Sequence, residues 1–450
     1  MLGPENHAVT MHLAQKVLGF HYEDIPHEAI EVARQCVLDW FGVTFAGMKE
    51  PLCEILKAQV EEEGGSEQAT VFGFFKKGTA IQAALVNGAA SHALDYDDVN
   101  KACLGHPTAP VLPAVLALAE QMGLSGRAFL NAFICGYEIE CRIGLLVGRV
   151  HYNKGFHGTA TIGTFGAASA CSKLLELNAE QTTHAFGIAG TQAAGLKSMF
   201  GTMCKPFHAG KAAANGLLAA KLAARGFDSS PAVLETKQGF ADTLSEGCNT
   251  ELALDDPEGG YHIRNNLFKY HAACYLTHAP IEALKKLRVE NRLKTEDIES
   301  VILTVEPGLL DVCCINEPQT GLECKFSLRH TAALALSGVD TGALETYSDA
   351  NANRPDLLEL RKKVKVSLEG DDRNVVMVGV TLKNGKQLSG THDSGIPASN
   401  VSAQGERIKA KFRKLASAAV GTEKSEKILD AVYRLETIED ICELTALCVE

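Results

Sequence analysis

The sequence lacks the features that mark several familiar classes of protein. No apolar run reaches the about 18 residues of a membrane span, and the opening segment MLGPENHAVT has neither the basic nor the apolar region of a secretory signal. The 14 cysteines are scattered and form no Cys-x-x-Cys motif. We therefore expect reduced thiols in a cytoplasmic protein that has no membrane partner.

Motifs for common cofactors are also missing. The glycine-rich segment 155–166 lacks a preceding strand and the Gly-x-Gly-x-x-Gly spacing, and the chain has neither a phosphate-binding loop nor a Gly-x-Ser-x-Gly elbow. It also lacks a His pair at i, i+4 and a spaced Cys set for a metal, so we expect no metal and no organic cofactor. The net charge of −12 argues against a nucleic-acid partner and leaves any anionic substrate to local basic side chains.

Helical periodicity dominates what is present. Over residues 1–265, apolar residues recur at helical spacing and many helices are rich in Ala and Gly. Period-2 runs begin only later, at SVILTVE (300–306) and NVVMVGVTL (374–382), and Asn384-Gly385 marks a hairpin turn after the second run. The patterns predict a mainly α protein. Its large all-helical domain spans 1–265 and 397–450, and an α+β domain with an antiparallel sheet, 266–396, is inserted in it.

A cluster of titratable residues lies between two apolar, helix-like runs, 81–94 and 111–119. The residues of this cluster are Asp95, Asp97, Asp98, Asn100 and His106. Prolines at the start of the second run predict that the acidic segment is a loop or helix end held between buried helices. Caps and a solvated turn would explain these residues as well as catalysis would, so both interpretations stay open here.

Three further polar clusters interrupt apolar helical sequence. His157 opens a Gly- and Ala-rich helix, and Lys205 and His208 stand three residues apart before another Ala-rich helix. The third cluster, 269–278, lies where the composition changes from α to α+β, and a domain seam is a usual place for a small-molecule site. Periodicity alone does not show that these clusters meet.

Four motifs, in this order, resemble the MmgE/PrpD family: LDYDDV…GHPTAPVLPAVLALAE, GFHGTATIGTFGAA, KPFHAGKAAANGLLAA and KYHAACYLTHAPIEAL. That family includes 2-methylcitrate dehydratase, cis-aconitate decarboxylase and iminodisuccinate epimerase, and the resemblance covers nearly the whole chain. It implies that the α+β domain is a lid and that the protein is a homodimer. It also implies a cofactor-independent site between the domains that takes a small polycarboxylate.

The resemblance also suggests which residues act. On this interpretation the catalytic residues are Asp95, His106, His157, Lys205 and Cys274, and the substrate-binding residues are Asn100, His208, Lys269 and His278. Asp95 and His106 would move a proton next to a substrate carboxylate, with His157 on the opposite face. Two positions depart from the decarboxylase pattern, since Val99 or Asn100 replaces a Thr and Cys274 replaces a His.

We therefore expect a lyase, most closely a 2-methylcitrate-dehydratase-like hydro-lyase. An epimerase and a decarboxylase are the alternatives within the family. A non-catalytic carboxylate-binding or scaffold protein is the alternative from another class.

Overall fold

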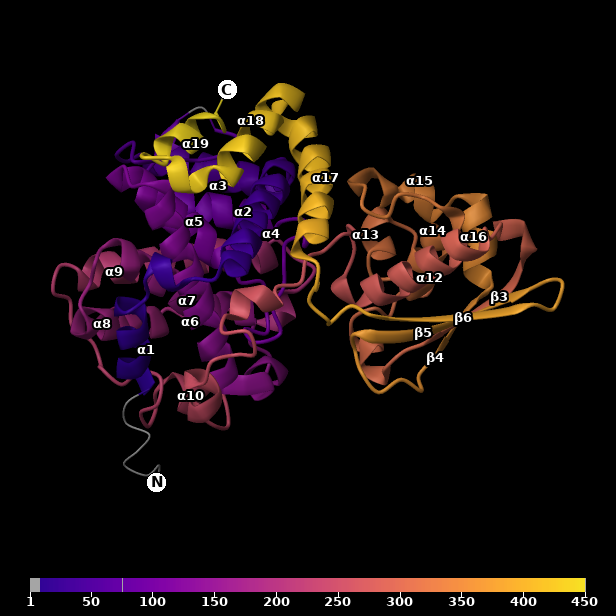
Figure 1. The fold of residues 1–450 in the computed structure, drawn as a ribbon, viewed down its shortest axis with the longest axis horizontal. Coiled ribbons are helices and arrows are strands. Elements are labelled where there is room, and N and C mark those ends of the chain that lie inside the picture. The colour runs from indigo at the N-terminus through magenta and orange to yellow at the C-terminus, as the bar shows by residue number, and fades with distance from the viewer. Residues whose placement is uncertain (1–8, 75, 450) are drawn as a thin grey trace. The chain divides into compact units, whose positions relative to one another are not determined.

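The computed structural model describes residues 9–74 and 76–449 and divides into two compact units. The first unit comprises Met1–Phe268 and Ser399–Glu450, and the second is Lys269–Ala398. The first unit is largely helical, and the second combines helices with a four-stranded sheet (Figure 1). The prediction of a mainly α protein is confirmed.

Most of the first unit is built from α-helices. They are α1 (Val9–Leu18), α2 (His27–Gly47), α3 (Pro51–Glu63), α4 (Ala80–His92), α5 (Thr108–Met122), α6 (Gly126–Asn153), α7 (Gly158–Leu174), α8 (Ala179–Gly190), α9 (Cys204–Ala223), α10 (Phe240–Leu244), α11 (Thr250–Leu254), α17 (Val401–Val420), α18 (Thr422–Tyr433) and α19 (Cys442–Ala446). None of the helices within 9–74 and 76–449 combines the length and the apolarity that crossing a membrane requires.

The expectation of an all-helical first domain was wrong in one detail. Two short strands, β1 (Ala69–Thr70) and β2 (Lys77–Gly78), pair antiparallel between α3 and α4. Strands of this length are too short to give a period-2 pattern, which is why the sequence did not indicate them.

Close helix packing positions the polar ends of α4 and α9. Helix α9 packs against α4, α5 and α7, and α17 packs against α2. A Cβ atom on Gly210 of α9 would lie 2.2 Å from the carbonyl oxygen of Leu85 on α4, so only glycine permits this approach. The contact brings His92, at the end of α4, toward Lys205 in the first turn of α9.

The second unit combines a sheet with helices on it. Its elements are α12 (His278–Asn291), β3 (Ile298–Thr304), α13 (Gly321–Cys324), α14 (Leu328–Ser337), α15 (Asp349–Ala352), α16 (Pro355–Lys362), β4 (Val364–Ser367), β5 (Val375–Leu382) and β6 (Gln387–Asp393). The alternation predicted for β5 is present, because Val376, Val378 and Val380 are buried whereas Met377 is exposed.

The predicted antiparallel sheet was wrong in part, because the sheet is mixed. Its strand order is β4-β3-β5-β6, with β3–β5 and β5–β6 antiparallel but β3–β4 parallel. Parallel neighbours need a long crossover, and here α13 to α16 supply it. Strand β4 has four residues and begins at Val364, soon after α16 ends at Lys362.

Candidate active site

The loop between α4 and α5 forms the centre of the site. Its backbone turns immediately after α4, where the amide of Asp95 donates to the carbonyl of His92 at 3.1 Å. Asp95 has φ of +50°, a left-handed conformation in which Asp is enriched among non-glycine residues. Further along, the amide of His106 donates to Thr159 Oγ1 of α7 at 3.0 Å, which anchors the end of the loop.

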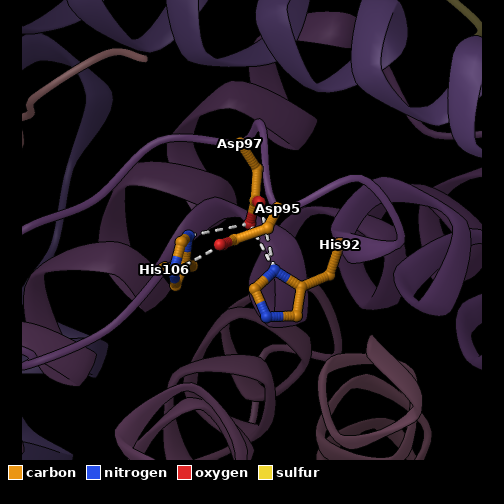
Figure 2. Close-up of side chains that lie close together, drawn as sticks. All are labelled: His92, Asp95, Asp97 and His106. Atoms are coloured by element: carbon orange, nitrogen blue, oxygen red, sulfur yellow. Dashed lines mark hydrogen bonds and ion pairs between the residues drawn. The ribbon is translucent and has the colours of Figure 1, made fainter. Parts of the chain in front are cut away.

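Asp97 bridges two imidazole rings (Figure 2). Its Oδ2 lies 2.8 Å from His92 Nδ1 and 3.1 Å from His106 Nδ1. Burial raises the pKa of Asp97, but the two imidazoles lower it more, so the carboxyl's pKa lies well below its ordinary value. An ionised carboxylate only accepts hydrogen bonds, so His92 Nδ1, which is hydrogen-bonded to it, carries a proton, and the same carboxylate 3.1 Å from His106 Nδ1 favours a proton there as well. Nε2 of His106 is therefore the ring atom that can take up or release one.

His92 is the buried partner of this bridge. Burial lowers its pKa to about 4 even though Asp97 opposes the shift, so its ring is neutral at pH 7. Its ring centroid lies 4.5 Å from that of His106. A neutral His92 therefore holds the Asp97 carboxylate by a hydrogen bond without neutralising its charge. The negative charge of Asp97 then acts on His106.

The more open side of the site carries Asp95 and Lys205. Lys205 Nζ lies 2.8 Å from Asp95 Oδ1, and the same oxygen lies 3.6 Å from His106 Nε2. The Asp95 side chain is 30% exposed and that of Asp97 is 2% exposed, so the cluster is accessible from the Asp95 side. His106 thus has one carboxylate at each ring nitrogen, and the outer one is paired with an ammonium group.

His157 and His208 lie beside this cluster. Their Nδ1 atoms are 3.1 Å apart, and the rings of His157 and His92 stack with centroids 5.7 Å apart. The pKa of His157 lies well below its ordinary value because of burial first and the neighbouring His92 and Lys205 next. Burial and Lys205 likewise lower the pKa of His208. Both rings are therefore neutral and polarised by a nearby cation.

Asn100 holds the loop rather than extending toward this cluster. Its Nδ2 donates to Tyr137 Oη and to the carbonyl of His262, both at 3.0 Å, and its Oδ1 accepts from the amide of Ala102 at 2.9 Å. The side chain is buried. The predicted substrate contact of Asn100 would compete with these bonds.

A second polar group lies in the other unit and contains Lys269, Cys274 and His278. Burial first, and then the neighbouring His271 and Lys269, hold the pKa of His278 well below its ordinary value. His271 Nε2 lies 3.2 Å from Glu282 Oε1, and its ring centroid is 4.8 Å from that of His278. The second unit therefore presents a buried lysine within a histidine-rich environment.

The Cys274 thiol has a different partner from these groups. It hydrogen-bonds with the thiol of Cys313, and this bond together with burial raises the pKa of Cys313. Burial in apolar surroundings makes a thiol a poor nucleophile, and Cys274 is buried.

Sequence reasoning missed His92 and His271, and it placed Asp97 in the cluster without giving it a role in the site. The signal for His92 was available, since a histidine in the last turn of an apolar helix needs a buried partner. Asp97 is five residues further on and supplies it. A solvated turn was one of the two interpretations left open for Asp97, because Asp is common in turns for purely local reasons.

The four side chains drawn in Figure 2 form a candidate ligand set for a divalent cation. Ligand atoms of His92, Asp95, Asp97 and His106 all lie within 4.8 Å of one another. The ammonium of Lys205 already supplies positive charge to Asp95 at 2.8 Å, so a metal would have to displace it. The expectation that the protein needs no metal remains a prediction.

Comparison with known proteins adds to this geometry. Residues 11–253 match the family model of the MmgE/PrpD N-terminal domain, and residues 271–437 match that of the MmgE/PrpD C-terminal domain. The chain is 29% identical to a cis-aconitate decarboxylase of Aspergillus terreus (strain NIH 2624 / FGSC A1156), covering 94% of this chain and 92% of the relative. It is 27% identical to the cis-aconitate decarboxylase of Homo sapiens, covering 98% and 94%. A mitochondrial 2-methylcitrate dehydratase of Yarrowia lipolytica is 26% identical over 75% of this chain and 68% of its own length.

Proposed function

Given that the chain belongs to the MmgE/PrpD family and is a lyase, we propose that it moves a proton at a carbon next to a carboxylate of a small tricarboxylic acid, without a metal or organic cofactor. The observation that supports this most directly is the placement of His106 between two carboxylates. With Nδ1 committed to Asp97, Nε2 faces the accessible side and Asp95. This is the arrangement that a general acid or base needs.

Electrostatics decide how the substrate would bind. A tricarboxylate carries several negative charges, and the Lys205 ammonium lies on the accessible side of the cluster. We assign Lys205 to a substrate carboxylate, where a charge-assisted hydrogen bond also stabilises negative charge that develops on the neighbouring carbon. Asp95 then orients His106 or exchanges a proton with it. His157, whose ring is neutral, would serve the opposite face of the substrate.

We propose that the second unit acts as a lid. Its buried Lys269 would meet a further carboxylate of the substrate, and closure would exclude water from the carbanion. His278 would contribute to the same part of the site as Lys269, and the buried Cys274 would line it. The homodimer expected from the sequence is retained as part of the proposal.

Decarboxylation of a cis-aconitate-like acid is the reaction we favour. In that reaction the bond to the leaving carboxyl carbon breaks and carbon dioxide departs. The electron pair shifts the double bond, and the carbanion is protonated next to a remaining carboxylate. The relatives from Aspergillus terreus and Homo sapiens, which cover nearly the whole chain, are named cis-aconitate decarboxylases, and this supports decarboxylation as the first candidate. The substitution of Cys274 for the expected His is the observation against it.

Dehydration is the second candidate, and the relative named 2-methylcitrate dehydratase supports it. There the cluster would remove the proton next to a carboxylate, and an acid would assist the departure of the hydroxyl group. This reaction was ranked first from the sequence alone. The same residues would serve both reactions. They would donate a proton to the carbanion in decarboxylation and remove a proton from carbon in dehydration.

Turnover of a substrate panel in D₂O, followed by proton NMR, tests the proposal. The panel contains cis-aconitate, citrate, 2-methylcitrate and iminodisuccinate. We expect cis-aconitate to yield carbon dioxide and a dicarboxylate that carries deuterium next to a carboxylate. Loss of water from 2-methylcitrate alone would favour the second candidate. Binding without turnover of any member would overturn the proposal in favour of a carboxylate-binding protein.

A further inference from the structure

Lys411 reaches from α17 to the loop that carries the acid and base residues. Its side chain is buried, and Nζ donates a 2.7 Å hydrogen bond to the carbonyl oxygen of Tyr96. The same ammonium lies 2.7 Å from Asp39 Oδ1 on α2. It also lies 4.0 Å from the centroid of the Tyr96 ring, within the range of a cation–π contact.

The contact with Lys411 matters because Tyr96 lies between two residues of the site. Tyr96 separates Asp95, which has a left-handed backbone, from Asp97, which bridges the two imidazoles. The carbonyl that Lys411 holds belongs to the peptide that joins Tyr96 to Asp97. Rotation of that peptide would move the Asp97 carboxylate away from His106.

Other anchors of the loop lie after this peptide in the chain. Thr108 Oγ1 donates to Asp98 Oδ2 at 2.6 Å, and Val99 exchanges two backbone hydrogen bonds with Leu267, each 2.9 Å long. These bonds fix the loop beyond Asp97. The hydrogen bond from Lys411 holds the loop between Asp95 and Asp97. A lysine ammonium group that is buried and paired is a rigid support.

We propose that Lys411 is a positioning residue that sets the distance between Asp97 and His106. Its ammonium group bridges the Tyr96 carbonyl and the Asp39 carboxylate and so fixes the backbone of the loop. This inference rests on the proposed proton-transfer function. It links that function to α17, the first helix after the second unit in the chain order. A purely structural role is the alternative, because breaking a buried ion pair destabilises a protein wherever the pair lies.

The test compares Lys411→Met with a matched control, Lys77→Met. Lys77 Nζ lies 2.8 Å from the buried carboxylate of Glu120 in the same unit, so its replacement also breaks a lysine–carboxylate pair between elements. Both variants are measured for melting temperature and for kcat and KM per folded molecule. Proteins labelled with ¹⁵N-histidine are then compared by NMR, which reports the protonation and hydrogen bonding of each imidazole without requiring turnover.

We expect Lys411→Met to lower kcat by about 10-fold or more, as for other misplaced catalytic groups, with KM changed far less. The imidazole signals of His92 and His106 should shift. Lys77→Met should lower the melting temperature while leaving kcat and these signals unchanged. Lys411→Arg keeps the charge and should recover part of kcat, and it serves as the informative variant if Lys411→Met does not fold.

An unchanged kcat and unchanged His92 and His106 signals in a folded Lys411→Met or Lys411→Arg protein would overturn the inference. Failure of the proposed function looks different, because His106→Gln would then also keep full activity. Loss of activity in His106→Gln together with normal activity in the Lys411 variants refutes the positioning role alone.

Discussion

The bridge between Asp97 and the two imidazoles makes Asp97→Asn an informative substitution. An ionised carboxylate accepts from both Nδ1–H groups, whereas an asparagine amide offers one oxygen and one NH₂ group. Asp97 Oδ2 contacts both Nδ1 atoms and Oδ1 lies 3.0 Å from His92 Nδ1, so an NH₂ group in the place of either oxygen would face at least one Nδ1–H. One of the rings must then change tautomer or turn away, and a change at His106 moves the proton from Nδ1 to Nε2.

The size of the effect follows from the bonds that are lost. A hydrogen bond to a charged group contributes on the order of 1.5 to 3 kcal/mol, which corresponds to roughly 10- to 150-fold in rate. We therefore expect kcat of Asp97→Asn to fall by this amount. KM should change little, because the ammonium assigned to the substrate, on Lys205, contacts Asp95 rather than Asp97.

Steady-state kinetics of folded protein, with circular dichroism as the check of folding, measure this effect. Asp98→Asn is the control, since Asp98 is the buried neighbour of Asp97 and contacts Thr108 at 2.6 Å. The control should keep the wild-type kcat. Equal kcat values for wild type and Asp97→Asn would refute the assignment of Asp97 as the group that orients His106.

Three further predictions concern metal, charge and pH. Dialysis against a strong chelator should leave turnover intact, and a loss restored specifically by one divalent ion would contradict the metal-free proposal. Lys205→Ala or Lys269→Ala should lower kcat/KM by roughly 10- to 150-fold through loss of a charge-assisted hydrogen bond, and wild-type values in both would remove these lysines from the site. Burial raises the pKa of Asp98 from 3.8 to about 7, so the native state keeps a proton that the unfolded state releases. The stability of wild type relative to Asp98→Asn should therefore fall as pH rises from about 4 to 7, and urea unfolding at several pH values that shows a constant difference would contradict this.

Periodicity indicated the fold wherever elements were long enough. The run at 374–382 gave β5, and its alternation matches the burial of Val376 and Val378. Strand β4 was missed because four residues give little alternation, and its parallel pairing depends on the crossover rather than on any local pattern. Local sequence thus specified the elements, and tertiary connections specified the sheet.

The site shows a similar division. Helical patterning suggested that Asp95 and His106 lie in a loop between buried helices, but resemblance to a family was needed to connect them with Lys205, which the structure places 2.8 Å from Asp95. His92 escaped notice and Asp97 was left without a role, because the role of each comes from burial and from their mutual contact across a turn. Neither property can be read from composition or spacing.

The most direct test of the central claim is turnover of cis-aconitate in D₂O by wild type and by His106→Gln. The account predicts that wild type forms a product deuterated at a carbon next to a carboxylate. His106→Gln should remain folded but turn over at roughly one hundredth of that rate or less, the usual size of a lost acid or base contribution. If His106→Gln instead turned over at the wild-type rate and only melted at a lower temperature, His106 would be a structural residue at the start of α5 and the proposed proton transfer would be wrong.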